Sequence, residues 1–188
     1  MKSMSVAMSA ALTLVVLLLV AWAVREDLLR RRIPNALCFA ALMLGLGMMS
    51  IAGGLIGLLY SAGGVLVGLL TFVPFYLLRG MGAGDVKLMA ALGSFFGPAG
   101  ALLAAAISLV AGGVYAIVIA ISKLLRTKSQ MGASSPGAES PTASQLAAVF
   151  AVVRKERFPY SVAIATGVVG SLWLRGSLRD VTVALAIG

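Results

Sequence analysis

The chain has 188 residues, of which 61% are hydrophobic and only 11% are charged, and its formal net charge is +9. Soluble domains contain about 45–50% apolar and about 25% charged residues, so a lipid bilayer is the expected solvent for a chain of this composition. The basic residues flank apolar segments instead of forming one basic face, which indicates topology signals and argues against binding to nucleic acid.

The residue types that are missing exclude several kinds of catalysis. Histidine is absent, and the single cysteine, Cys38, lies in an apolar stretch. Catalysis by Ser-His-Asp or Cys-His groups, a disulfide and most catalytic zinc sites are therefore excluded. Paired carboxylates and a Ser-Lys dyad remain possible.

The apolar segments predict an all-α, polytopic membrane bundle of about six spanning helices, because each span needs about 20 apolar residues. The first run, 6–24, is longer than the apolar core of a signal peptide and precedes basic residues, so we interpret it as a retained span. A tight turn is expected at Gly53-Gly54, and a break in the long stretch 86–122 is expected within 97–100 (GPAG), although the sequence leaves its exact position open. The expected spans are 4–24, 36–52, 55–78, the two parts of 86–122, and 158–174.

Outside the spans, 25–35 and 79–85 are expected to be connections, the second of them rich in glycine. The segment 123–157 is polar and basic, and its Ser-, Gly- and Pro-rich centre is typical of a flexible loop. Within it, 145–153 could form a short interfacial helix, whereas the apolar segment 181–188 is too short to cross a membrane. We expect a single membrane-embedded domain, 1–188, with this loop in the cytoplasm.

Glycine is abundant, at 22 residues. The spacings Gly53-x-x-x-Gly57 and Gly64-x-x-x-Gly68 let helices approach closely. We interpret them as ordinary helix packing and not as a specific dimer motif.

The positive-inside rule predicts the orientation. If the connection after the first span is cytoplasmic, twelve basic residues lie inside and only Lys2, Arg175 and Arg179 lie outside. Both termini are then outside. Asp27 and Asp85 fall on the cytoplasmic side, at the ends of the first and third spans.

Asp85 is the most informative residue, because it follows a glycine-rich run between two apolar stretches. An ionisable residue near membrane depth is costly and by default indicates a functional site. Gly82 and Gly84 leave room for a substrate backbone and for close approach to the second carboxylate, and Gly84 could also supply a positive φ.

The second aspartate, Asp27, precedes a segment that is expected to enter the membrane in a fixed, non-helical conformation. Pro34 disfavours helix at Ile33, and Asn35 is a good N-cap for the second span.

Two facing carboxylates could hydrolyse a peptide without a metal ion or a covalent intermediate. At about 4 Å and an effective dielectric constant near 20, two negative charges repel by about 4 kcal/mol, so the pair would share one proton near neutral pH. The ionised member can take a proton from water while the protonated member polarises the scissile carbonyl. The sequence leaves open which aspartate has which role.

Simpler interpretations compete with this one. Asp85 could only cap the fourth span, and Asp27 could only balance the neighbouring arginines. Lys87 is expected to be a topology signal or a neighbour of a carboxylate. Ser94 lies seven residues further on, too far for a ready Ser-Lys dyad.

Three motifs resemble those of the type IV prepilin peptidases, which are leader peptidases among the Gly-x-Gly-Asp membrane aspartyl proteases. The resemblance extends over roughly 6–174, without the loop 123–157. The motifs are 27–35 (DLLRRRIPN), 80–93 (GMGAGDVKLMAALG) and, more weakly, 158–165 (FPYSVAIA).

The resemblance implies that Asp27 and Asp85 are the catalytic pair, with Gly82, Gly84, Pro34, Asn35 and Lys87 shaping the site. It implies cleavage of short basic leaders from prepilins at the cytoplasmic face of the inner membrane. Larger members of the family carry paired cysteines that are associated with N-methylation. This chain has one cysteine, so it is similar to the short, peptidase-only enzymes of Flp/Tad-type pili, and neither zinc nor a methyl donor is expected.

Two other functions stay open. A small protein with two membrane-edge aspartates could be a proton-coupled transporter, or a non-catalytic component of a pilus or secretion apparatus. The absence of an internal repeat and the same-side placement of both aspartates argue against transport. The sequence does not predict an oligomeric state.

Overall fold

The computed structural model describes residues 2–78, 80–131, 160–174 and 176. These residues form helices and short connections, with no strand among them, which confirms the all-α prediction. The expected interfacial helix at 145–153 and the segment 181–188 lie outside the described residues. In chain order the helices are α1 (Lys2–Arg30), α2 (Asn35–Leu77), α3 (Ala83–Met131) and α5 (Tyr160–Leu174).

Helix α1 is longer than the expected first span, because it continues through the charged residues to Arg30. The prediction that the connection begins at Arg25 is therefore wrong. Leu, Arg and Glu are good helix formers, and the basic residue in the last turn interacts favourably with the helix dipole. The helix ends at Arg30, and the next residue, Arg31, has φ 51° and an N–H that donates to the Asp27 carbonyl at 2.8 Å. Asp27 consequently lies in the last helical turn and not in a loop.

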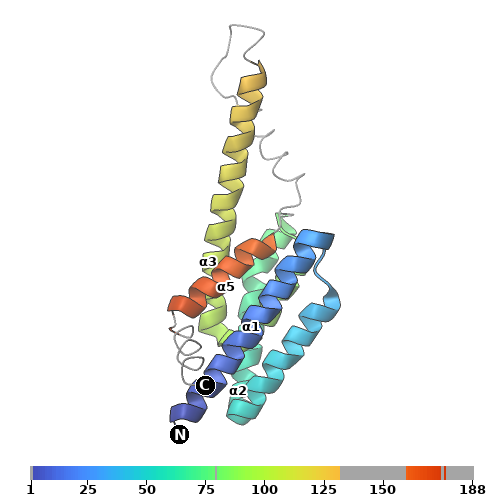
Figure 1. The fold of residues 1–188 in the computed structure, drawn as a ribbon. Helices are drawn as coiled ribbons and strands as arrows, with labels where there is room; N and C mark the ends of the chain where they lie inside the picture. Colours follow the sequence, from blue (N-terminus) through green and yellow to red (C-terminus); the bar gives the residue numbers. More distant parts are fainter. Residues whose placement is uncertain (1, 79, 132–159, 175, 177–188) are drawn as a thin grey trace.

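Helix α2 reverses direction near its middle (Figure 1). Gly54 has φ 58° and ψ −141°, a conformation that is open essentially to glycine alone. Beyond this point Gly57 lies directly against the Met49 carbonyl of the first half. The tight turn predicted at Gly53-Gly54 is therefore confirmed, and α2 is a helical hairpin.

Helix α3 is also divided, since Gly97 has φ 67° and ψ −178° and is followed by Pro98. The Tyr60 ring lies against Gly97 and occupies the space that a side chain would need there. The break predicted within 97–100 is confirmed, and it lies at Gly97. Beyond it α3 extends past the other helices (Figure 1), so 123–131, which was expected to begin a flexible loop, is helical.

Glycines bring the helices into close contact. Gly64 lies against the Gly93 carbonyl, and a Cβ at Gly68 would be 2.7 Å from the Met89 carbonyl oxygen. The second half of α2 therefore packs antiparallel to the first half of α3, which confirms that the Gly64-x-x-x-Gly68 spacing serves helix packing. In the Gly53-x-x-x-Gly57 spacing, by contrast, a Cβ at Gly53 would have no neighbour within 4 Å, so Gly53 does not bring two helices together.

Helix α5 packs antiparallel to the second half of α3, where Gly167 lies against Ser108. The other face of α5 is turned toward α1. Helix α5 thus joins α1 to the α2–α3 body.

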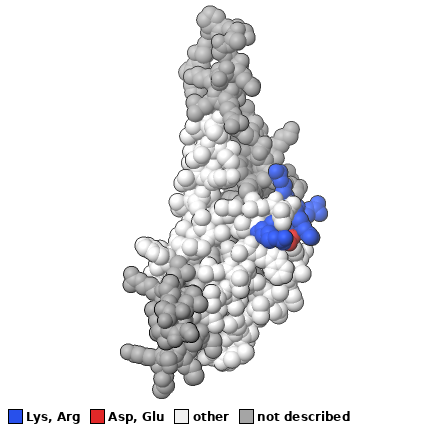
Figure 2. Space-filling model, viewed as in Figure 1, with Lys and Arg blue, Asp and Glu red and all other residues white. Residues whose placement is uncertain are grey.

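The outer surface is largely apolar. Many large hydrophobic side chains are exposed, among them Ile51 (84%), Ile56 (81%) and Leu78 (78%). Among the described residues on the face shown in Figure 2, charged side chains gather at one place, beside the end of α1 in Figure 1. Among the described residues, α2 and α3 are long and apolar enough to cross a membrane, and α5 is a shorter apolar helix. An exposed apolar surface of this extent is typical of contact with lipid.

Candidate active site

Four helix ends meet at one end of the bundle (Figure 1). The C-terminal end of α1 lies there with the N-terminal ends of α2, α3 and α5. Contacts between residues distant in sequence define the meeting point: Ser161 with Asp27, Lys87 with Asn35, and Gly84 with Ile33.

Asp27 contributes its carboxylate from the last turn of α1. Its Oδ2 accepts a hydrogen bond of 2.6 Å from the Ser161 hydroxyl of α5. The arginines are paired instead with Glu26, which lies 3.1 Å from Arg30 Nε and 3.4 Å from Arg25 Nη1. The interpretation of Asp27 as their counter-ion is therefore not supported, because Glu26 has that role among the described residues.

Asp85 lies in the first turn of α3. Its Oδ2 accepts a hydrogen bond of 3.2 Å from the backbone N–H of Gly82, the residue before the first helical position. This is the return bond of a capping box, in which the third helical residue bonds back to the N-cap. Asp85 therefore helps to begin the helix, but from the third position and not as the N-cap itself.

Asp27, in the last turn of α1, and Asp85, in the first turn of α3, thus lie at the same meeting point of helix ends. Both side chains are partly buried. The fold thus brings together two aspartates that are separated by more than fifty positions in the sequence.

The segment before α2 differs in part from the expectation. Pro34, with φ −62° and ψ 132°, is the N-cap residue, and its carbonyl accepts from the N–H groups of Leu37 (3.1 Å) and Cys38 (3.3 Å). The prediction of Asn35 as N-cap is wrong, because Asn35 is already the first helical residue. Its Oδ1 accepts a hydrogen bond of 3.0 Å from Lys87 Nζ, which ties the start of α2 to the start of α3.

Ile33 and Pro34 are non-helical, as the proline predicted. Gly84 is not among the residues with positive φ, so the conformational reason considered for this glycine is wrong. Gly84 has a steric role that was not predicted, because a Cβ at Gly84 would lie 3.3 Å from the Ile33 Cβ, whereas room for a substrate stays a prediction. A Cβ at Gly82 would lie 3.1 Å from Asp85 Oδ2. Both glycines therefore allow close approach at the site.

The Ser-Lys alternative has no support in the geometry. The Ser94 hydroxyl donates to the Ala91 carbonyl at 2.6 Å, whereas Lys87 donates to Asn35. Within the described part of the chain, no group of three His, Cys, Asp or Glu residues could hold a metal ion.

Ser161 was not among the residues predicted to form the site. Ser161 lies in the third motif, directly after Pro159-Tyr160, and could have been noticed there. Sequence spacing alone, however, does not connect it to Asp27, which is 134 positions away. Tyr160 was missed in the same way. It packs edge-on against Phe72 with ring centroids 6.4 Å apart, and thereby fixes the start of α5 to α2.

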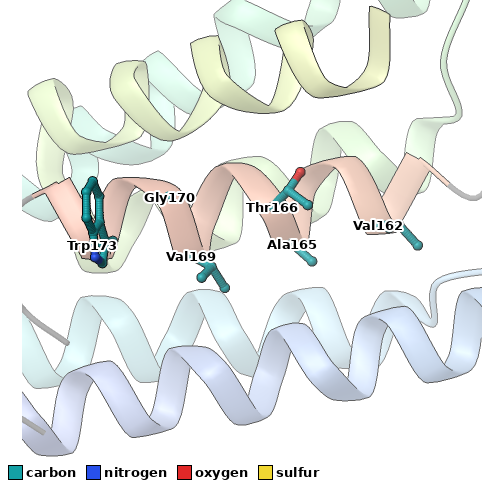
Figure 3. A pocket seen from close by; sticks show the side chains of 6 residues that line it. All are labelled: Val162, Ala165, Thr166, Val169, Gly170 and Trp173. Atoms are coloured by element: carbon teal, nitrogen blue, oxygen red, sulfur yellow. The ribbon is translucent and has the colours of Figure 1, made fainter. Parts of the chain in front are cut away.

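An open apolar hollow lies along the face of α5 that is turned toward α1 (Figure 3). It has no titratable side chain in its lining and is therefore not a place for acid–base chemistry. Its lining residues are Val162, Ala165, Thr166, Val169, Gly170 and Trp173.

Residues 11–117 match the model of the type IV leader peptidase family. The match includes both aspartates and ends before α5. No curated protein and no solved structure matches the chain.

Proposed function

The chain belongs to the type IV leader peptidase family, and on this basis we propose that it is a membrane aspartyl endopeptidase that removes the short basic leader from prepilins or prepilin-like proteins. The observation that carries the proposal is the placement of Asp27, in the last turn of α1, and Asp85, in the first turn of α3, where the helix ends meet at one end of the bundle. Each comes from a different helix, and each lies inside the matched region.

The proposed reaction uses the two carboxylates as general acid and general base. One ionised aspartate takes a proton from a water molecule that attacks the scissile carbonyl, while the protonated partner donates to the carbonyl oxygen. When the peptide bond breaks, the proton that the first aspartate took from water passes to the leaving amine, and the second aspartate recovers its proton from the hydroxyl of the intermediate. Such a pair needs neither a metal ion nor a nucleophilic side chain, which agrees with the absence of histidine from the sequence.

The proposed arrangement has six spans in the inner (cytoplasmic) membrane. The breaks at Gly54 and Gly97 divide α2 and α3 into two segments each, and α1 and α5 supply the remaining two. The basic residues at the end of α1 lie beside Asp27, and basic residues favour the cytoplasmic side. This supports a cytoplasmic position for the site.

Cleavage of a purified prepilin tests the proposal. The protein is reconstituted in liposomes and compared with Asp27→Asn and Asp85→Asn, and the new N-terminus of the product is identified by mass spectrometry. The proposal predicts cleavage between the basic leader and the apolar helix by the unaltered protein only. Proton flux without cleavage would favour a transporter, and neither activity would favour a non-catalytic assembly component.

A further inference from the structure

We propose that Ser161 is a positioning residue that fixes the orientation of the Asp27 carboxylate. The inference rests on the proposed peptidase function and extends it to α5, which lies outside the region that matches the family. The contact that carries it is the hydrogen bond of 2.6 Å from the Ser161 hydroxyl to Asp27 Oδ2. An O–H bond to a carboxylate of this length is in the charge-assisted range.

The other buried serines show why this contact is informative. The hydroxyls of Ser94, Ser108 and Ser171 donate to carbonyls of their own helices, and Ser61 donates to the Ser94 carbonyl. Bonding to the preceding turn is the usual solution for a serine within a helix. Among the buried serines of the described chain, only Ser161 bonds to a carboxylate.

The start of α5 is held in place on several sides. Ser161 has no exposed surface, and the next turn of the helix buries Ala163 and Ile164. Tyr160 packs on Phe72 of α2, and its hydroxyl lies against Gly112 of α3. The serine hydroxyl is therefore attached to a fixed part of the bundle.

Asp27 has fewer constraints of its own. Helix α1 makes most of its helix–helix contacts with α5 and few with α2 or α3. The Ser161 bond consequently connects the α1 carboxylate to the part of the bundle that carries Asp85. Without it, the carboxylate can rotate about its side-chain torsions and leave the geometry that both aspartates need.

The position of a catalytic group affects the rate more than it affects substrate binding. A displacement of about 1 Å can cost roughly a hundredfold in rate. We therefore expect Ser161→Ala to lower kcat for prepilin cleavage about 10–100-fold with KM within about twofold of the unaltered value. Ser161→Thr, which keeps the hydroxyl, should recover most of the loss.

The test uses the full chain in liposomes and measures kcat, KM and the thermal unfolding midpoint. Ser171→Ala is the matched control, because Ser171 lies in the same helix, is equally buried and bonds only to the Val168 carbonyl. Its kcat should be unchanged. Asp27→Asn is included so that failure of the proposed function is seen separately.

Three outcomes decide the matter. A selective fall in kcat for Ser161→Ala supports the inference, and recovery by Ser161→Thr strengthens it. If Asp27→Asn is inactive while Ser161→Ala cleaves at the unaltered rate, or loses activity only in parallel with a lowered unfolding midpoint, the inference is overturned and the proposed function stands. If Asp27→Asn cleaves normally, the proposed function itself fails.

Discussion

The helical body formed by α2 and α3 and the candidate site at the helix ends are held together by different kinds of contact. In the body, α2 and α3 pack through glycines at backbone distance, as at Gly64 and Gly93. At the candidate site, side-chain hydrogen bonds join the helix ends, as between Asp27 and Ser161 and between Lys87 and Asn35. At these glycines the body leaves no room for an additional atom, whereas at the site Asp27 and Asp85 are partly buried and Lys87 is exposed.

This difference predicts which property each region controls. A methyl group added at one of these glycine contacts meets a backbone carbonyl that cannot move aside without a shift of the helix, so folding suffers. A polar atom removed at the site changes the position or chemistry of a carboxylate, so catalysis suffers while the bundle persists. Substitutions in the two regions should therefore separate stability from activity.

The largest effect is expected from the aspartates. Asp27→Asn and Asp85→Asn should each reduce prepilin cleavage by roughly 10²–10⁴-fold, the usual contribution of a general acid or base. Asparagine has nearly the same shape, so membrane insertion and the unfolding midpoint should remain close to the unaltered values. The cleavage is followed as a gel shift of prepilin. Substantial residual cleavage by either variant would argue against a two-aspartate mechanism.

The next effect tests the body. Gly64→Ala should lower the free energy of unfolding by about 1–3 kcal/mol, because its Cβ meets the Gly93 carbonyl. Gly47→Ala in the same helix is the control, since a Cβ there has no neighbour within 4 Å, and it should be neutral or slightly stabilising. Thermal unfolding in detergent measures both. Equal stability of the two variants would contradict the close packing of α2 on α3.

A smaller effect is expected at the boundary of the two regions. Gly84→Ala places a Cβ 3.3 Å from the Ile33 Cβ and shifts the start of α3, so we predict cleavage at least about tenfold slower with normal insertion. Met81→Leu keeps the volume and apolarity of a buried side chain and should be near neutral. Initial rates of the two variants are compared side by side. If they are equal, Gly84 acts only as a linker.

No effect is expected from reagents directed at other mechanisms. Cleavage should survive EDTA, serine-directed inhibitors and Cys38→Ser, because Cys38 is a buried thiol and the chain has no histidine. The measurement is the initial rate after treatment. Loss of activity with EDTA that zinc restores would indicate a metal site.

The sequence predicted the divisions of the fold well, because glycine and proline act locally. Gly54 and Gly97 adopt positive φ at the two places where a turn and a break were expected. The end of α1 was predicted less well. Charge suggested a connection from Arg25, whereas the helix formers among these residues continue the helix to Arg30.

At the candidate site, too, features that depend on local sequence were predicted, whereas contacts between distant helices were not. The glycine-rich run identified Asp85, and the Ile-Pro-Asn segment identified the neighbourhood of Asp27. The partner of Asp27 could not be predicted, because the bond to Ser161 depends on how α5 docks against α1. The partner of Asn35 could not be predicted for a similar reason. The residue type favoured an N-cap within its own helix, whereas in the structure the Asn35 side chain accepts a hydrogen bond from Lys87 of another helix.

The central claim is that Asp27 and Asp85 act as one catalytic unit. The most direct test compares the single variants with Asp27→Asn/Asp85→Asn under single-turnover conditions, with enzyme in excess of prepilin. Residues that act as a unit are strongly non-additive, so the double variant should cleave no more slowly than the slower single variant. If the two losses multiply instead, the aspartates act independently and the proposed mechanism is contradicted.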